Sequence, residues 1–215
     1  MFPMLGDGIF TQEGATWKRT RELVRPLFAH REYEDLGFLR AAVDNLIAAI
    51  AAETRGGIVD LQPLLYRLTL DTTTAFLFGE SVESLKAPDS AGEQRFAAAF
   101  DFAQECVAKR FRLLDLYWLI GGKEFQHSCK VVQNFAAQII ERNFPQGSAS
   151  EHRIHRYVFS KSFAERIPDK DALRGHAVNM LAAGRDTTAC LLAWTLYVTT
   201  SICASLFLTS KAASL

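Results

Sequence analysis

A carboxylic acid beside a hydroxyl, preceded by two very small residues, is the most chemically suggestive feature of the sequence. Asp186 is followed by Thr187, and Ala183 and Gly184 come just before them. A carboxyl group next to a hydroxyl can relay protons to a reacting molecule. Ala183 and Gly184 leave space for a flat ligand against the backbone, although a helical glycine costs about 1 kcal/mol relative to alanine. These residues predict a site of proton transfer.

The same residues also allow a purely structural interpretation. Thr187 and Thr188 can donate hydrogen bonds to carbonyls one turn earlier, which bends or locally widens a helix. A packed helix whose Gly, Asp and Thr residues merely satisfy one another would have this sequence too. The choice between the two interpretations depends on the rest of the chain.

A second candidate site consists of Trp17 and Arg21, four residues apart. Helical spacing of four places both side chains on one face. An indole N–H and a guanidinium on the same face form an acceptor site for a carboxylate, which arginine binds with two parallel hydrogen bonds. The alternative is an amphipathic surface helix with a half-buried tryptophan.

Helical patterns dominate the chain and position both candidate sites. Asp169 is a good N-cap for a long helix that carries residues 183–188, with Asp171 in its first turn. Pro26 disrupts or ends the helix that carries Trp17 and Arg21. Further helices are expected at residues 32–54, 61–77, 96–111 and 125–140, with a possible short strand at residues 58–60. The predicted fold class is mainly α.

Composition limits the possible functions. The chain has 215 residues, and the 49% that are hydrophobic are typical of a globular protein. Its formal net charge is zero, which gives no sign of a nucleic-acid partner. Its four cysteines show no metal-site spacing, so we predict no metal bound directly by cysteine pairs. His152 and His155 could form a metal pair, but a solvated basic surface is the favoured interpretation. The Phe-rich helices at 96–111 and 125–140 would suit an apolar substrate or, more simply, a core.

The motif Ala183-Gly184-Arg185-Asp186-Thr187-Thr188 resembles the oxygen-binding helix, helix I, of the cytochrome P450 family. Trp17 and Arg21 are similar to the W-x-x-x-R pair that holds a haem propionate on that family's helix C. The resemblance covers about residues 5–197, from helix C to helix I. Residues 76–85 look most like the fungal alkane and fatty-acid hydroxylase branch.

The resemblance implies a monooxygenase that inserts one oxygen atom from O2 into a small apolar substrate. It implies haem as cofactor, electrons from NADPH through a reductase partner, and a parent protein on the endoplasmic reticulum membrane. Trp17 and Arg21 would bind a haem propionate, Ala183 and Gly184 would leave room for haem and O2, and Asp186 with Thr187 would deliver protons.

Parts of the family pattern are not found in the sequence. The cysteine motif F-x-x-G-x-R-x-C-x-G and the E-x-x-R expected after helix I are absent, as are the first sheet and the membrane anchor. We therefore expect a partial P450 domain at residues 1–197 with a divergent tail at 198–215, inactive alone and cytoplasmic or aggregated if expressed. The alternative is a non-catalytic all-helical interaction or membrane-associated fragment, since no charged residue occurs between Asp186 and Lys211.

Overall fold

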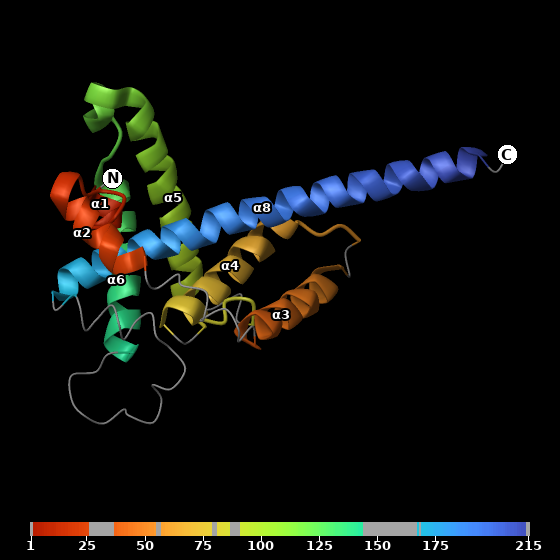
Figure 1. Ribbon diagram of the computed structural model, residues 1–215, viewed down its shortest axis with the longest axis horizontal. Helices are drawn as coiled ribbons and strands as arrows, with labels where there is room; N and C mark the ends of the chain where they lie inside the picture. The colour runs from red at the N-terminus through yellow and green to blue at the C-terminus, as the bar shows by residue number, and fades with distance from the viewer. Residues whose placement is uncertain are drawn as a thin grey trace.

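The computed structural model describes residues 2–25, 37–54, 57–78, 81–86, 91–143, 167 and 169–213, and within these ranges every regular element is a helix. The prediction of a mainly α fold is confirmed for this part of the chain. The helices are α1 (Phe2–Leu5), α2 (Gly14–Val24), α3 (Gly37–Glu53), α4 (Leu61–Phe78), α5 (Ala91–Leu113), η4 (Leu114–Leu119), α6 (Lys123–Asn143) and α8 (Lys170–Ala213) (Figure 1).

The long helix α8 is the element against which the others pack. It contacts α1, α4 and α6, while α5 pairs with α6 and α3 pairs with α4. Figure 1 shows α8 crossing the whole molecule, with its C-terminal part extending past the other helices. The predicted start of this helix is confirmed, because Asp169 Oδ1 accepts the Asp171 N–H at 3.0 Å and α8 begins at Lys170.

Two hydrophobic clusters meet along α4 and α8. The larger joins α5, α6 and α8 through completely buried side chains such as Phe100, Val132 and Val178. The smaller packs α3 on α4 and includes Ala42, Leu64 and Ala189. Apolar stripes at helical spacing therefore serve mainly as core in this protein.

The prediction of a short strand at residues 58–60 is wrong. These residues form no strand, and Ile58 is almost fully exposed. Asp60 accepts the Gln62 N–H at 3.0 Å with Oδ1, so its carboxylate caps the first turn of α4. An Ile-Val pair in a connection was mistaken for a strand, although no neighbouring strand exists in the described residues to pair with it.

The N-terminal segment is attached to α8 by one buried amide. Asn179 Nδ2 donates to the carbonyls of Leu5 and Gly175 at 2.9 and 2.7 Å, and its Oδ1 accepts the Phe10 N–H at 2.9 Å. Gly175 allows this approach, because a Cβ there would lie 2.3 Å from the Asp7 carbonyl oxygen. This attachment fixes where α2 can begin.

Candidate functional site

Thr187 and Ala183 lie one turn apart on α8 and are joined by a hydrogen bond. The Thr187 hydroxyl donates to the Ala183 carbonyl at 2.6 Å, as the sequence predicts, while the helix stays α-helical through this turn. Thr187 is exposed and Ala183 is half-buried. At this turn of α8, Ala183 and Thr187 therefore present small side chains.

Gly184 is a contact point between helices. A Cβ at this position would lie 2.7 Å from Thr73 Oγ1 and 2.9 Å from Thr73 Cγ2, on α4. The missing side chain thus allows α4 and α8 to approach closely. Whether Gly184 also borders a haem stays a prediction.

Arg185 is a charged residue in the interior, and sequence reasoning did not single it out. Its side chain is 3% exposed, and Nη1 contacts Asp101 Oδ1 at 2.7 Å and Asp186 Oδ1 at 3.1 Å. The guanidinium carbon also lies 4.7 Å from the ring centroid of Tyr66 and 5.0 Å from that of Phe100. Two carboxylates and two aromatic faces offset the cost of burying this cation.

Asp186 holds its proton more tightly than an ordinary aspartic acid. Burial is the main cause of its raised pKa, and the negative charge of Asp101 adds to the increase. The Arg185 charge and hydrogen bonds from Gln104 and Arg185 act in the opposite direction. A carboxyl group balanced between these influences is suited to giving and taking protons.

Trp17 and Arg21 stack on one face of α2, as predicted. The guanidinium carbon of Arg21 lies 5.3 Å from the centroid of the Trp17 ring, which is 36% exposed. They border a shallow cavity of about 420 Å³. Its lining residues are Gly14, Trp17, Lys18, Arg21, Glu22 and Arg25. Because this lining has three cationic side chains, Lys18, Arg21 and Arg25, and one carboxylate, Glu22, the cavity favours an anionic group of a ligand.

No hydrogen bond or ion pair within the described ranges joins the Trp17–Arg21 pair to Asp186 or Thr187. The two candidate sites are linked through the backbone, since the segment attached by Asn179 leads into α2. Asp186, Thr187, Ala183 and Gly184 lie together on α8, and Trp17 and Arg21 lie together on α2. The predicted site residues therefore fall into two groups, one on α8 and one on α2, and their joint role at one site stays a prediction.

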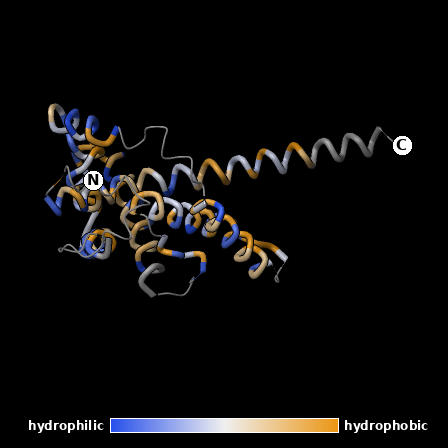
Figure 2. The backbone as a smooth tube through the Cα atoms, turned by 60° about the horizontal axis from the view of Figure 1, so that its bottom comes forward, coloured by the Kyte–Doolittle hydropathy of each residue, from blue (hydrophilic) through white to orange (hydrophobic). Residues whose placement is uncertain are grey.

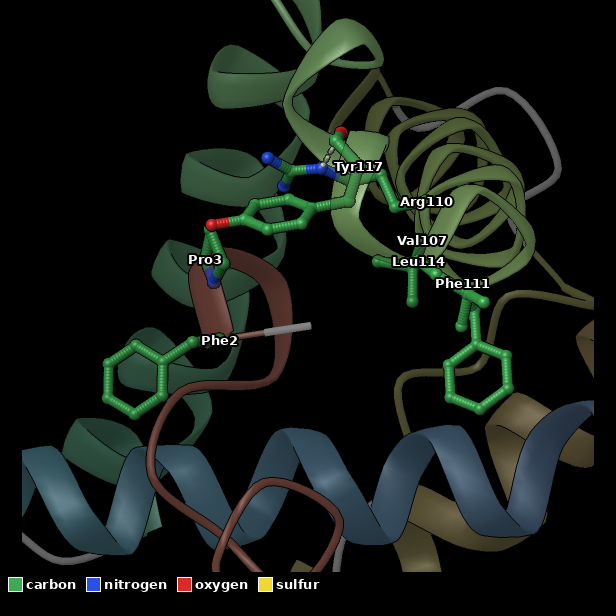
Figure 3. Close-up of a pocket in the computed structure, with 7 residues that line it drawn as sticks. All are labelled: Phe2, Pro3, Val107, Arg110, Phe111, Leu114 and Tyr117. Carbon is green, nitrogen blue, oxygen red and sulfur yellow. Dashed lines mark hydrogen bonds between the residues drawn. The ribbon is translucent and has the colours of Figure 1, made fainter.

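A second cavity, of about 490 Å³, lies between α1 and the junction of α5 with η4 (Figure 3). Its walls are mostly apolar. They comprise Phe2, Pro3, Val107, Arg110, Phe111, Leu114 and Tyr117. Arg110 Nε donates to the Tyr117 carbonyl at 3.2 Å, which ties the end of α5 to η4. This cavity could take an apolar molecule.

The phenylalanines of α5 and α6 serve mainly as core. Phe96, Phe100 and Phe125 are buried, and the rings of Phe96 and Phe135 stack with centroids 3.9 Å apart. Phe111, in contrast, is exposed and lines the second cavity. Of the aromatic residues considered for substrate contact, Phe111 is the one whose position suits that role.

The cysteines form no metal site. In the described part of the chain, no group of three His, Cys, Asp or Glu residues could hold a metal ion. Burial raises the pKa of Cys106, and raises that of Cys129 to about 11, whereas Cys190 and Cys203 are exposed. The possible pair His152 and His155 lies outside the described residues.

The apolar C-terminal stretch gives no membrane span. Among the helices described, none is long and apolar enough to cross a bilayer. Figure 2 shows strongly hydrophobic segments interleaved with near-neutral ones along the coloured stretch of the extended part of α8. Thr195, Thr199, Thr200 and Ser201 account for this mixed character.

Comparison with known proteins gives a family match over most of the chain. The cytochrome P450 family model matches residues 2–200. A cytochrome P450 of Arthroderma benhamiae is 43% identical over 196 residues, covering 89% of this chain and 39% of that protein. Cytochrome P450 52A4 of Candida maltosa is 37% identical, covering 90% and 38%, and cytochrome P450 monooxygenase g430 of a Fusarium species is 35% identical, covering 89% and 37%. The chain thus spans about two fifths of the length of these relatives.

Proposed function

The chain belongs to the cytochrome P450 family, and from this premise we propose that it forms part of a haem-dependent monooxygenase acting on alkane-type or fatty-acid-type substrates. The observation that carries the proposal is the α8 site, where the partly buried Asp186 carboxyl has a raised pKa and the next residue, Thr187, exposes its side chain. In the whole protein, an NADPH-dependent reductase would supply electrons, and a location on the endoplasmic reticulum membrane follows from the family.

The residues present fit one side of a haem. Ala183 and Thr187 present small side chains on one turn of α8, against which the edge of a flat ring system could lie. Trp17 and Arg21 border a cavity rich in cations, which suits a propionate carboxylate. When bound, the haem would supply the iron that activates dioxygen. Arg21 and Trp17 would orient it by holding one propionate.

The role of Asp186 and Thr187 is to hold and move protons at this turn of α8. The raised pKa keeps the Asp186 carboxyl protonated closer to neutral pH than a solvated aspartic acid. The Thr187 hydroxyl donates its own proton to the Ala183 carbonyl, so its oxygen lone pairs remain free to accept. Asp186 would hold the proton to be delivered, and Thr187 would accept a hydrogen bond from a group held at this turn.

A long apolar substrate would fit the cavity between α1 and the α5–η4 junction (Figure 3). Its walls are mostly hydrocarbon and aromatic, and Phe111 and Leu114 expose large apolar surfaces into it. Burial of such surface stabilises a bound alkyl chain by about 0.8 kcal/mol per methylene group.

The proposed function is tested by a chimera. Residues 2–197 replace the matching segment of cytochrome P450 52A4, and the reduced, CO-bound spectrum and hydroxylation of an alkane and a fatty acid are measured. We expect a thiolate-type Soret band and hydroxylated product, with turnover reduced in the Asp186→Asn chimera and the spectrum unchanged. A correctly loaded chimera with no product would overturn the proposal.

For this chain alone we expect no hydroxylation and weak haem association without a thiolate-type spectrum. The purified chain reconstituted with haem and reduced under CO provides the measurement. A thiolate-type Soret band from the chain alone would contradict this expectation and would assign the ligand to one of its own cysteines.

A second candidate function, a non-catalytic interaction or membrane-associated fragment, is favoured by exposed apolar side chains. They gather on η4 and on α8 beyond Cys190. They include Leu114, Leu116, Trp118, Leu191, Trp194, Tyr197 and Ile202. Such surfaces promote association. A monomer in sedimentation equilibrium that also fails to bind lipid vesicles would rule this candidate out.

A further inference from the structure

The buried cation next to the proposed proton donor has a specific geometry. One nitrogen atom of Arg185, Nη1, is shared between Asp101 on α5 and Asp186 on α8, at 2.7 and 3.1 Å. Asp101 has the shorter contact, and its side chain is 54% exposed, whereas that of Asp186 is 29% exposed. Nη1 carries two N–H bonds and can donate to both carboxylates, so Asp101 on α5 and Asp186 on α8 share the positive charge of one guanidinium.

We propose that Arg185 is a positioning residue for Asp186 and that Asp101 shares its positive charge, so that the charge state of Asp186 depends on whether α5 lies against α8. This inference rests on the proposed role of Asp186 in proton delivery. When α5 is close, Asp101 takes up part of the guanidinium charge and places a second negative charge near Asp186. When α5 moves away, Arg185 pairs with Asp186 alone and stabilises its ionised form.

The guanidinium of Arg185 is held in place by two aromatic rings. Tyr66 on α4 and Phe100 on α5 lie against the guanidinium, and its Nε has no hydrogen-bond acceptor among the described residues. The cation is therefore held between aromatic faces with Nη1 directed at both carboxylates. Movement of α5 removes Asp101, Phe100 and the Gln104 hydrogen bond to Asp186 together.

The arrangement also connects α5 with the proposed substrate cavity. The last two turns of α5 carry Val107, Arg110 and Phe111, which line that cavity. The Asp101 contact lies on the same helix, two to three turns earlier. A ligand that shifts α5 would therefore change the electrostatic environment of Asp186.

The test measures the titration of Asp186 in the chain itself, without haem. Carbon-13 NMR of protein labelled at the aspartate carboxyl groups follows the titration, and Asp186→Asn assigns its signal. We expect Asp101→Asn to shift the Asp186 midpoint to lower pH, because it removes a like charge that shares the guanidinium. Arg185→Gln should shift it to higher pH, and Arg185→Lys should give an intermediate value.

The matched control is Glu105→Gln, which removes one negative charge from α5 at an exposed position paired with Lys109. It should leave the Asp186 midpoint nearly unchanged. Equal shifts in Asp101→Asn and Glu105→Gln, or no shift in Asp101→Asn, would overturn the proposal. Asp101 is half-exposed, so its variant should fold even if the Arg185 variants do not. The titration is independent of the chimera assay, so the two proposals can fail separately.

Discussion

The side-chain oxygen of Asn179 accepts the backbone N–H of Phe10 at 2.9 Å, although 169 positions separate the two residues in the chain. The same completely buried amide donates to the Leu5 carbonyl. This side chain on α8 therefore contributes to ordering the segment that leads into α2, where Trp17 and Arg21 lie. Loss of this amide should affect both the stability of the fold and the position of the cation-rich cavity.

Asn179→Leu should lower the free energy of unfolding by about 3 kcal/mol, because backbone groups of Leu5 and Phe10 would stay buried without their partner. Urea unfolding followed by circular dichroism measures this. Asn134→Leu, at an exposed position of α6, is the control and should change stability by about 0.5 kcal/mol or less. Equal effects of the two substitutions would contradict the attachment described here.

Gly184→Ala should destabilise the protein by about 1 to 3 kcal/mol, because the new Cβ would meet Thr73 on α4. The gain in helix propensity of about 1 kcal/mol offsets part of this loss. Thr73→Ala in the same protein should restore most of the stability, as thermal unfolding of the single and double variants would reveal. Gly121→Ala serves as control, since nothing lies within 4 Å of a Cβ there.

The four thiols should fall into two reactivity classes. Cys190 and Cys203 are exposed and should react quickly with a disulfide reagent at pH 8, whereas Cys106 and Cys129 should react only after unfolding. A count of thiols modified before and after addition of urea gives the result. Equal reaction rates for all four thiols would be inconsistent with the packing of α5 against α6.

Cys129 should also make stability depend on alkaline pH. Its folded-state pKa is about 11, above the ordinary value of 9.0, so the fold favours the protonated thiol. The contribution is complete below about pH 9 and is lost as the pH rises toward 11. Urea unfolding at several pH values measures the slope, and Cys129→Ala should reduce it. An unchanged slope would show that other groups account for the alkaline loss.

Arg21→Gln should weaken haem association by roughly tenfold, because it removes a charge-assisted hydrogen bond to a propionate. Absorbance titration of the chain with haem measures the affinity. Arg19→Gln, which removes an exposed cation of the same helix outside the cavity lining, is the matched control. If both variants lose the same affinity, the attraction depends on net charge alone and Arg21 has no specific role.

Local patterns in the sequence predicted local structure well. The cap at Asp169, the stacking of Trp17 on Arg21 and the return of the Thr187 hydroxyl to Ala183 each involve residues within four positions of one another. Helical geometry alone brings such residues together.

Contacts between distant segments were not predictable in the same way. Arg185 meets Asp101 across 84 positions, and no spacing rule connects them. The helical turn η4 was likewise missed, since Leu114 adopts a positive φ of 47° that only the surrounding packing can impose. A signal for Arg185 did exist, because an arginine between buried positions of a helix requires partners for its charge.

The length of α8 implies a gradient of local stability along one continuous helix. Its 44 residues correspond to roughly 66 Å at the standard rise. Up to Ala189 the helix has buried contacts on α4, α5 and α6, whereas the side chains from Trp194 to Cys203 are exposed. A helix without tertiary contacts frays readily. Backbone amides near Val178 should therefore exchange with deuterium through global unfolding, and those near Ile202 within seconds, so that one helix reports two timescales.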